Sequence, residues 1–558
     1  MFAKRSKGIF IIILMAFLLL IGRLGWLMLV RGDALAARAQ EQRLRSIELY
    51  QYQRGDILDR NMRSLTGQEA PCLVVFPTLI GDPQKAAQSL SEALEYYYDE
   101  GILTEKLSSA SQSPYILQAN LDAETAAAVQ ELAWPGIMVI NLCPRYADPP
   151  LANHLLGFVG SATQEEAEAL GLSAAGLLVG KTGLEKQYDQ LLRDRSGPTV
   201  GIVVDERGQQ TNDSLFLIGS DSQNNGGRLV LTLNRDYQQI AEAALEGYNG
   251  AVVVMDVQNG QVLAMASYPT YDPYLGQPAD TDELNSYVNK ALAAYPPASV
   301  FKLVLAAAAL ENGLDLPEDF ICEGSYTLTN GHTVSCWKKD GHGEENMAEA
   351  LANSCNCYFV WLGQELGGDA IQSYANRFGL RESQLIGYNL ALTNVGLSFN
   401  SKVPADVANV SIGENGVRLT PVMVAQIIST IANGGYRVTP QLVLGTIAAG
   451  SETIQYLTAV EPERAISEGT ATTLQNMLAE AVKSGTAVNA ASQIVTTAGK
   501  TGTTQYQGVW FAGFAPVDEP KWAVSVYVSN GTAGGKEGAA IFKEIVEKLA
   551  ILEGISKK

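Results

Sequence analysis

Basic residues and histidines are scarce in this sequence. Its 39 lysines and arginines stand against 59 aspartates and glutamates, which gives a formal net charge of -20 at pH 7. Nucleic-acid binding would need a basic surface to neutralise phosphates, and no long basic run supplies one. The chain has only three histidines and lacks a G-x-S-x-G motif, which argues against its being a Ser-His-Asp hydrolase. Lys181-Thr-Gly183 lacks the preceding Walker spacing, so we expect no nucleotide and no other cofactor.

Cysteine is also sparse. The six cysteines are Cys72, Cys143, Cys322, Cys336, Cys355 and Cys357. Outside the membrane a disulfide is permitted, and Cys322 with Cys336 is the favoured pair. A zinc site is the alternative, made from Cys322, Cys336, Cys355, Cys357 and either His332 or His342. The missing C-x-x-C spacing disfavours that site, and buried free thiols are a third possibility.

One long hydrophobic run is present, from Gly8 to Val30, and only Arg23 interrupts it. About 20 such residues span a bilayer, and the basic residues before the run predict a cytoplasmic N-terminus with the remaining chain outside. A cleaved signal peptide is the rival, since Ala34-Leu-Ala36 resembles a cleavage site, but the run is longer than a signal core. Because a charge within a span is costly, Arg23 is expected to reach the interface or face a partner helix.

A chain of 558 residues predicts two or three domains, and 47% hydrophobic residues provide ample core. The best linker candidate is the polar, glycine-containing stretch Ser220–Gly227. We therefore expect a cytoplasmic tip and membrane anchor over 1–31, a pedestal domain over 32–227, and a catalytic domain over 228–558.

The patterns predict an α+β fold for the catalytic domain. An initial hairpin turns at Asn259-Gly260, helices fill about 300–433, and terminal strands pair with the hairpin. The predicted strands are 251–257, 261–267, 510–514 and 522–528, followed by a helix over 541–552. In the pedestal the predictions are a helix over 34–49, a strand over 72–76, and helices over 83–100 and 123–133.

The most informative motif is Ser299-Val-Phe-Lys302. A proline pair before it and an alanine- and leucine-rich run after it place Ser299 in the first turn of a buried helix. Lys302 lies one turn later, on the same face. A serine becomes nucleophilic when a base takes its proton, and burial can lower the pKa of a lysine enough for that role. The pattern predicts a nucleophile, Ser299, with its own base, Lys302.

S-x-x-K alone is a weak pattern, and Ser335-Cys-Trp-Lys338 is a second copy. It lies among residues typical of a loop, so we predict that it is not catalytic.

Two further clusters offer the groups that a serine and lysine still need. Ser354-Cys-Asn356 follows a helical pattern and provides a hydroxyl and an amide. Lys500-Thr-Gly-Thr503 follows a strand pattern, and such a strand presents an ammonium, two hydroxyls and a close backbone approach. Other copies of these patterns, at Lys181, Ser222, Ser398 and Lys483, stand in helix or loop contexts. Order and context therefore single out the three motifs.

The order S-x-x-K, S-x-N, K-[ST]-G resembles that of the penicillin-recognising serine acyltransferases. The wider chain is similar to class B penicillin-binding proteins, the monofunctional peptidoglycan D,D-transpeptidases. Arg54–Asn61 looks like their R-G-x-I-x-D-R-N-G signature, and Gly183-Leu-Glu185, Gly250–Pro273 and Ala512–Pro516 also look familial. The resemblance implies a penicillin-binding/β-lactamase-like fold with an antiparallel sheet flanked by helices, on an elongated N-terminal pedestal of the dimerisation type.

Three positions depart from the family pattern. Met62 and Ala298 stand where glycine is common, and Gly413-Glu-Asn415 replaces Gly-Gln-Gly. None removes a catalytic group, but they put local turn geometry in doubt.

The resemblance also implies a role for each site residue. Ser299 would attack the carbonyl between two terminal D-alanines of a stem peptide, with Lys302 as base, Ser354 in the proton relay and Asn356 on the peptide amide. The strand motif would contribute the rest: Lys500 tunes the relay, Thr501 and Thr503 hold the terminal carboxylate, and Gly502 allows close approach.

The implied partners are peptidoglycan stem peptides on glycan strands, β-lactams, and a separate membrane polymerase of the SEDS type. A D,D-carboxypeptidase or β-lactamase-type hydrolase is one alternative, and a non-catalytic penicillin-binding scaffold is the other. The long segment before the catalytic domain disfavours a small hydrolase.

Overall fold

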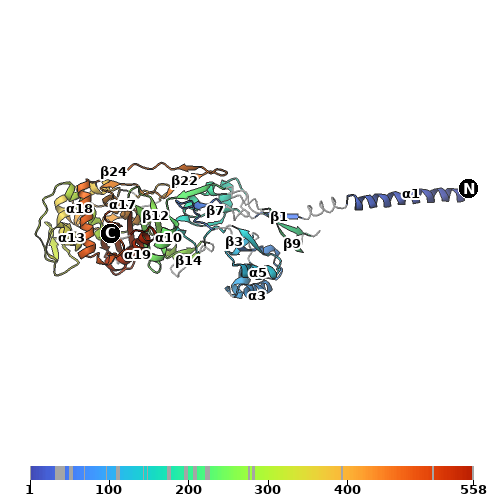
Figure 1. The fold of residues 1–558 in the computed structure, drawn as a ribbon, viewed down its shortest axis with the longest axis horizontal. Helices are drawn as coiled ribbons and strands as arrows, with labels where there is room; N and C mark the ends of the chain where they lie inside the picture. The colour runs from blue at the N-terminus through green and yellow to red at the C-terminus, as the bar shows by residue number, and fades with distance from the viewer. Residues whose placement is uncertain are drawn as a thin grey trace. The chain divides into compact units, whose positions relative to one another are not determined.

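The computed structural model describes two compact units, each built from several chain segments (Figure 1). The smaller comprises Met1–Gln53, Glu69–Pro144 and Arg195–Asn224, and the larger comprises Arg54–Gln68, Arg145–Asp194 and Asn225–Lys558. The described residues are 2–31, 44–48, 54–67, 70–95, 97–108, 114–142, 144–147, 149–172, 177–193, 199–204, 210–219, 226–273, 277–278, 283–381, 383–390, 394–505 and 508–555.

The first helix, α1 (Phe2–Leu29), contains the predicted hydrophobic run. Its segment Gly8–Leu29 is long and apolar enough to cross a membrane, with a mean hydropathy of 2.5. The guanidinium carbon of Arg23 lies 4.6 Å from the ring centroid of Trp26, which gives the charge a cation–π partner one turn away. That contact reduces the cost of Arg23 within the apolar run.

In the smaller unit, a three-stranded antiparallel sheet packs against three helices. The sheet has the order β4-β3-β5, with β3 Ala70–Val75, β4 Tyr115–Gln118 and β5 Ile137–Leu142. The helices are α3 Pro83–Ala93, α4 Glu100–Leu107 and α5 Ala123–Glu131. The strand predicted at 72–76 and the helix at 123–133 are confirmed.

Two predictions for this unit are wrong. The single helix expected over 83–100 ends at Ala93, and a new one begins at Glu100 because the Asp99 side chain caps it by accepting the N–H of Gly101. A helix is expected over 34–49, but the C-terminal part of this range forms strand β1 (Leu44–Glu48). This strand pairs with β8 (Thr199–Val204), and the pairing overrides the helix propensity of the segment. Residues 34–43 lie outside the described residues. Strand β9 (Gln210–Gly219) completes this second sheet.

The larger unit is built on a five-stranded antiparallel sheet of order β12-β11-β27-β26-β25. Its strands are β11 Gly250–Asp256, β12 Val262–Tyr268, β25 Ala498–Thr503, β26 Val509–Ala515 and β27 Trp522–Val528. The predicted pairing of an initial hairpin with terminal strands is confirmed. The hairpin loop is longer than the two-residue turn expected at Asn259-Gly260, because the strands stop at Asp256 and resume at Val262.

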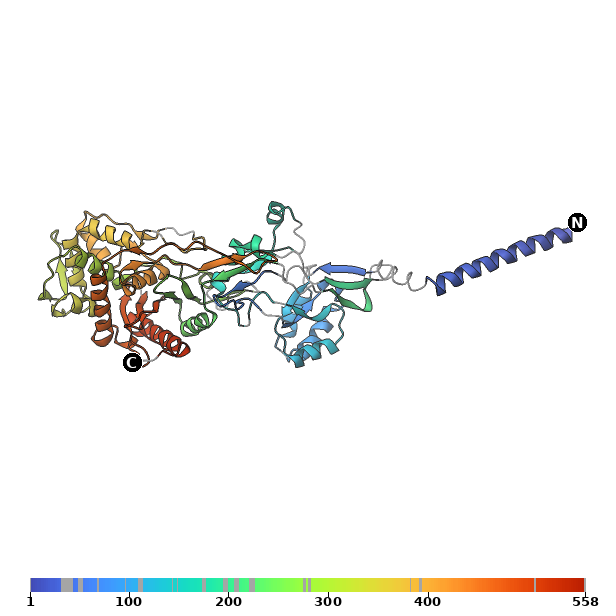
Figure 2. The same ribbon diagram turned by 45° about the horizontal axis from the view of Figure 1, so that its top comes forward.

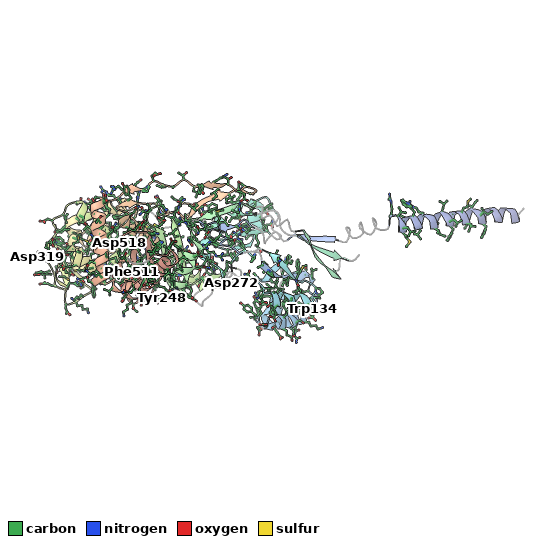
Figure 3. All side chains as sticks on the ribbon, viewed as in Figure 1. Trp134, Tyr248, Asp272, Asp319, Phe511 and Asp518 are labelled. Atoms are coloured by element: carbon green, nitrogen blue, oxygen red, sulfur yellow. The ribbon has the colours of Figure 1, made fainter. Side chains whose placement is uncertain are left out.

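Helices cover both faces of this sheet. On one side, Val252 and Val254 of β11 join the core formed with α10 (Arg235–Leu245) and α19 (Ala539–Leu552). Phe511 of β26, labelled in Figure 3, stacks against Phe542 of α19 with ring centroids 4.6 Å apart. The alternate side chains of β11 join the core of the helical block. Burial on both faces explains the continuous apolar character of these strands.

The helices between residues 300 and 433 form one block, and they lie next to one another in both ribbon views (Figures 1 and 2). Its helices are α12 Lys302–Glu311, α13 Met347–Ala352, α14 Asn356–Leu366, α15 Gly368–Arg377, α16 Pro404–Ser411 and α17 Pro421–Ala432. Helix α18 (Glu468–Ser484) leads back toward strand β25. Short strand pairs border the block: β15 Phe320–Cys322 with β18 Gly343–Glu345, and β16 Ser325–Thr327 with β17 Thr333–Ser335.

A second sheet in the larger unit has the order β2-β10-β22-β23. Its strands are β2 Ile57–Leu58, β10 Arg228–Leu231, β22 Val443–Ile447 and β23 Ile454–Tyr456. The remaining small elements here are α6 Asn153–Leu156, β6 Val159–Ser161, α7 Gln164–Ala169, β7 Leu178–Gly180, α8 Gly183–Gln187, α9 Asp189–Leu192 and α11 Glu283–Ser286. The segments that look familial in the sequence therefore fold together with the catalytic unit.

A buried ion cluster joins two of those segments. Arg54 Nε donates to Glu185 Oε2 at 3.0 Å, and Arg145 donates to the other oxygen of Glu185. Arg145 Nη1 also donates to the carbonyl of Gly55 at 2.9 Å. All three charged side chains are nearly inaccessible to solvent. Removing one partner would leave a buried charge unpaired. The R-G-x-I and G-L-E motifs therefore have a structural role, since their charged residues hold the two segments together.

Met62, one of the departures from glycine, lies in the left-handed region with a φ of 62°. A side chain pays about 1–2 kcal/mol for this conformation, whereas glycine adopts it freely. Glycine also loses about 0.4–1 kcal/mol more on ordering. We therefore expect Met62→Gly to leave the free energy of unfolding unchanged or raise it by up to about 1.5 kcal/mol, measured by denaturant titration. A clear loss of stability would contradict this account of the turn.

Candidate active site

Ser299 and Lys302 lie where the chain enters the helical block. Ser299 is half-buried in a 3-10 turn, η3 (Ala298–Phe301), and Lys302 is the first residue of α12 and fully buried. Ala298 stands in the left-handed region with a φ of 49°, and its N–H donates to Gly413 O at 2.8 Å. The predicted helix start is confirmed, and the second departure from glycine keeps the conformation that glycine favours.

Lys302 binds directly to the second motif. Its Nζ donates to the carbonyl of Ser354 at 2.9 Å and to Asn356 Oδ1 at 2.8 Å. Ser354 lies between α13 and α14 with a φ of 57°, a left-handed conformation that costs energy in a non-glycine residue. Asn356 begins α14. The structure thus brings together two motifs that are 52 to 54 residues apart.

Lys500, of the third motif, lies within the electrostatic reach of Lys302. Its side chain is fully buried in β25, and Nζ donates to the carbonyl of Thr501 at 2.9 Å. Burial, and secondarily the charge of Lys302, hold the pKa of Lys500 well below its usual range. Two buried ammonium groups repel each other, which favours a neutral amine at one of them.

Burial also lowers the pKa of Lys302 to about 8, against its ordinary value of 10.5. A lysine must be neutral to take a proton. The neutral fraction of Lys302 rises as the pH approaches this pKa and levels off above it. We therefore expect the rate constant for acylation by penicillin to rise as pH increases from 6 to about 8 and then to flatten. Stopped-flow acylation across this range measures it, and a profile that is flat or falls with pH would contradict the role of Lys302.

The other three strand residues differ in their surroundings. Thr501 Oγ1 lies 2.8 Å from Thr486 Oγ1, while Thr503 is exposed and its Oγ1 accepts the N–H of Gly534 at 3.2 Å. A Cβ on Gly502 would lie 3.1 Å from the carbonyl of Pro297 and 3.3 Å from Ala298 Cβ. The strand therefore passes close to the two residues that precede Ser299, and only a minimal residue fits there comfortably.

The second S-x-x-K copy forms no helix turn. Ser335 ends strand β17, and its side chain is exposed. Its backbone nevertheless supports the site, because the Asn356 side-chain amide donates to Ser335 O at 3.4 Å and the Asn356 N–H donates to Cys336 Sγ at 3.4 Å. No local pattern indicates these contacts, since 20 and 21 residues separate the partners.

The other decoy patterns stand in different structural contexts from the three site motifs. Lys181 donates to Glu166 at 2.6 Å ahead of helix α8, and Gly485 of the Lys483 copy ends helix α18. The copy at Ser222 lies outside the described residues.

Comparisons with known proteins agree with this arrangement. The penicillin-binding protein transpeptidase domain model matches residues 250–547, and the penicillin-binding protein dimerisation domain model matches residues 51–231. This chain is a class B penicillin-binding protein. It is 29% identical to stage V sporulation protein D of Bacillus subtilis over 97% of this chain and 84% of that protein. It is 30% identical to the penicillin-binding protein PbpB of Mycolicibacterium smegmatis, over 93% and 86%.

Solved structures give the same fold. Penicillin-binding protein 2 from Helicobacter pylori matches with a TM-score of 0.66 at 23% identity, over 92% of this chain and 99% of that one. The transpeptidase domain of an Eggerthella lenta peptidoglycan glycosyltransferase matches with a TM-score of 0.58 at 27% identity, over 72% and 91%. The predicted α+β transpeptidase fold with its N-terminal dimerisation-type domain is confirmed.

A group of buried thiols lies beside the S-x-N motif of this penicillin-binding protein. Cys322 and Cys336, expected to pair, are free thiols in the structure. The ligand atoms of Cys322, Cys336, His342 and Cys355 all lie within 4.8 Å of one another. Cys357 interacts with three of these thiols, whereas the other candidate, His332, is not part of the group. Of the three alternatives left open by the sequence, the disulfide is the one that the structure does not form.

The chemistry of this group suits a zinc ion. Three thiols and an imidazole are a common tetrahedral donor set for Zn²⁺. His342 Nδ1 lies 3.6 Å from Cys336 Sγ and 3.7 Å from Glu345 Oε2, which places an imidazole nitrogen beside the thiols. Cys322, Cys336, His342 and Cys355 would hold the ion. It would supply structural cross-linking of the loop that carries Asn356.

Zinc binding is directly testable. We expect reduced, chelator-free protein to contain close to one zinc per chain by elemental analysis. Strong chelation should lower its melting temperature by roughly 5 °C or more, because metal-binding free energy adds to folding free energy. A Cys72→Ser protein is the control, because Cys72 is a buried cysteine outside the group and this variant should keep its metal. The prediction would be contradicted if the protein contained no zinc and its melting temperature did not change when a chelator was added.

Proposed function

We infer that this class B penicillin-binding protein is a peptidoglycan D,D-transpeptidase that works through an acyl-enzyme on Ser299. The single observation that carries the assignment of residues is the buried Lys302, three residues from Ser299 and hydrogen-bonded to both Ser354 and Asn356. Relatives named peptidoglycan D,D-transpeptidases include that of Mycolicibacterium smegmatis, which is 32% identical over 63% of this chain.

In the first half-reaction, Ser299 Oγ attacks the carbonyl carbon between the two terminal D-alanines of a stem peptide. Lys302, whose pKa is lowered by burial to about 8, takes the hydroxyl proton in its neutral form. The C–N bond breaks, and a proton passes through the Ser354 hydroxyl to the leaving amine, so that D-alanine departs. The amine of a second stem peptide then attacks the ester, gives up a proton by the same route, and restores Ser299.

The remaining residues bind and orient the donor. The Asn356 side chain is fixed by Lys302 and offers its amide to the donor peptide. The hydroxyls of Thr501 and Thr503 hold the terminal carboxylate, and Lys500 tunes the proton relay electrostatically. The backbone N–H groups of Ser299 and Thr503 form the oxyanion hole, each donor contributing roughly 10² to 10³ in rate.

β-Lactams acylate the same serine, as the family's penicillin binding implies. A bound β-lactam leaves Ser299 slowly, so it both reports on and blocks the site.

Product analysis distinguishes transpeptidation from hydrolysis. Incubated with uncross-linked glycan strands that carry pentapeptides, the full chain should release D-alanine and form cross-linked dimers. A carboxypeptidase would instead yield trimmed monomers. Trimmed monomers alone would overturn the transpeptidase assignment, and absence of any D-alanine release together with persistent penicillin binding would favour a silent scaffold.

We also propose the membrane placement and the domain division that the sequence indicates. One helix, Gly8–Leu29, is suited to anchor the protein, with the N-terminus cytoplasmic and the catalytic domain outside. The proposed division is a pedestal over 32–227 and a catalytic domain over 228–558, although 54–68 and 145–194 of the pedestal range fold into the same compact unit as the catalytic residues. Protease digestion of intact and of opened spheroplasts tests the orientation.

A membrane glycosyltransferase of the SEDS type is the proposed partner. Support comes from Arg23, a charged residue in the apolar run whose guanidinium rests on Trp26 and whose polar edge suits a partner helix. Photo-crosslinkers at position 23 should capture the polymerase, whereas those at Leu18, on a plain apolar turn of the same helix, should capture it less. Equal capture of the polymerase at positions 23 and 18 would contradict a contact through Arg23.

A further inference from the structure

Glu537 is an acid next to the third motif that the transpeptidase mechanism above does not use. It lies in η5 (Gly534–Gly538), a short π-helix that leads into α19. Its Oε1 accepts the N–H of Thr532 at 3.0 Å and the hydroxyl of Thr532 at 2.6 Å, and its Oε2 accepts the N–H of Ala533 at 3.1 Å. The two carboxylate oxygens therefore hold the two residues that come directly before η5.

Glu537 is a carboxylate throughout the neutral pH range. Partial burial raises its pKa, but the hydrogen bonds from Thr532 and Ala533 outweigh burial and bring the pKa to about 2. Hydrogen bonds to a charged acceptor are stronger than those between neutral groups. The Glu537 side chain is thus firmly tied to the turn that precedes η5.

The turn that Glu537 holds places a backbone donor on the third motif. The N–H of Gly534 donates to Thr503 Oγ1 at 3.2 Å. A Cβ on Gly534 would lie 2.4 Å from Trp510 O and 2.5 Å from Gly502 O, so only glycine can approach β25 this closely. Because Gly534 directly follows the residues that Glu537 holds, a shift of the turn would move this N–H away from Thr503.

The rest of η5 has anchors of its own. The Asn489 side-chain amide donates to Gly535 O at 2.6 Å, and the N–H of Ala539 donates to the carbonyls of Gly534 and Lys536. Loss of the carboxylate at position 537 should therefore loosen the turn before η5 without unfolding α19.

The Gly534 N–H determines how the Thr503 hydroxyl can act. A hydroxyl has one proton to donate and two lone pairs that accept. The Gly534 N–H occupies one lone pair and so fixes the direction in which Oγ1 points. A hydroxyl that accepts one hydrogen bond is a stronger donor in the next, because the two bonds polarise each other. Thr503 is exposed, so its proton can reach a ligand.

We propose that Glu537 is a positioning residue for recognition of the terminal carboxylate of the donor peptide. It holds the Gly534 N–H on Thr503 Oγ1, and the oriented Thr503 hydroxyl then donates to the carboxylate. The inference rests on the proposed function, which assigns this carboxylate to Thr501 and Thr503. Glu537 acts on the substrate only through Thr503, so its effect must depend on the carboxylate.

Two donors separate this role from a general effect on the fold. One is a stem pentapeptide that ends in D-alanyl-D-alanine, and the other is the same peptide with a C-terminal amide in place of the carboxylate. The measured quantity is kcat/KM for release of D-alanine or of D-alaninamide, and wild type should prefer the carboxylate donor.

Glu537→Ala should lower kcat/KM for the carboxylate donor about 3- to 10-fold, mainly through KM, as expected when one hydrogen bond to a charged group is weakened. The amide donor should change by less than about twofold, because its neutral amide takes a weaker hydrogen bond from Thr503. The preference for the carboxylate donor should therefore shrink.

Two further variants make the test specific. In a Thr503→Val protein the hydroxyl is absent, so adding Glu537→Ala should cause no further loss, which a double-mutant cycle measures. Glu166→Ala is the matched control, because Glu166 also accepts a backbone N–H, that of Thr163 at 2.7 Å, but in the turn that begins α7. It should use both donors like wild type.

Wild-type kinetics in a folded Glu537→Ala protein would overturn the proposal. Equal losses with both donors would overturn it as well, since the effect would then not depend on the carboxylate. A further loss in the Thr503→Val background would do the same, because Glu537 would then act through another group. A wild-type protein that cleaves neither donor and forms no penicillin adduct would instead overturn the proposed function.

If Glu537→Ala does not fold, Glu537→Gln decides. Its side chain keeps the volume but has one acceptor oxygen where the carboxylate has two. It should lose part of the preference for the carboxylate donor, and an unchanged preference would overturn the proposal.

Discussion

Ser299→Ala protein should show no covalent labelling by fluorescent penicillin, while its fold and melting temperature stay close to those of wild type. The acyl-enzyme ester forms on the Ser299 hydroxyl, and no other group can replace that oxygen in the same position. Removing the nucleophile of a serine enzyme lowers its turnover by about 10⁶. Release of D-alanine from stem pentapeptides should therefore fall below detection as well. Gel fluorescence after denaturation measures the first effect, and chromatography of the released amino acid measures the second.

The second S-x-x-K copy provides the matched control. Ser335 has the same local sequence pattern but lies exposed at the end of a strand. Ser335→Ala protein should label like wild type. Labelling that persists in Ser299→Ala, or disappears in Ser335→Ala, would show that the nucleophile has been assigned to the wrong motif.

Lys302→Met protein should form the adduct about 10² to 10⁴ times more slowly than wild type, the range that a general base contributes. Methionine keeps most of the volume of the side chain in this buried place but cannot take a proton. The change also removes the hydrogen bonds to the Ser354 carbonyl and to Asn356 Oδ1, so both polar groups lose their donor. Stopped-flow acylation with penicillin measures the rate constant, and circular dichroism checks the fold.

Lys338, the lysine of the second copy, is the matched control for this variant. It is exposed, and Lys338→Met should keep the wild-type rate. Near-wild-type acylation by a folded Lys302→Met protein would assign the base to another group, of which Lys500 is the nearest candidate. The pH profile expected above for wild type should disappear in Lys302→Met if the rise toward pH 8 belongs to this lysine.

Local patterns were enough to predict much of the site. Prolines and an apolar run placed Ser299 and Lys302 at a helix start, and strand context distinguished Lys500 from Lys181 and Lys483. These features depend on neighbours within a few residues, where capping and backbone preferences act. The fold of the larger unit could be predicted for a related reason, since hairpin and terminal strands have clear hydrophobic patterns.

Contacts between distant segments could not be predicted. Asn356 binds Cys336 and Ser335, and Lys302 binds Ser354, all across tens of residues. The local patterns of a single sequence do not show which loops meet. Side-chain packing and backbone closure across the whole fold decide which segments come into contact. Strand β1 shows the same limit, since its pairing with β8 outweighs an alanine-rich, helix-like local pattern.

The departures from the family pattern turned out differently from one another. Met62 and Ala298 keep the left-handed conformation that the usual glycine would adopt. Their side chains change the energy of two turns but leave the backbone path in place. Glu414 instead places an ionisable side chain in a buried turn, where burial raises its pKa.

The most direct test of the account is to map the acyl-enzyme made from the donor itself. The full chain is mixed briefly with a stem pentapeptide ending in D-alanyl-D-alanine, quenched in acid and digested for mass spectrometry. We predict that one peptide, the one that contains Ser299, carries the donor minus its terminal D-alanine. The adduct should disappear when an acceptor amine is added. An adduct on any other residue, or release of D-alanine with no adduct in an acid-quenched sample, would contradict the central claim.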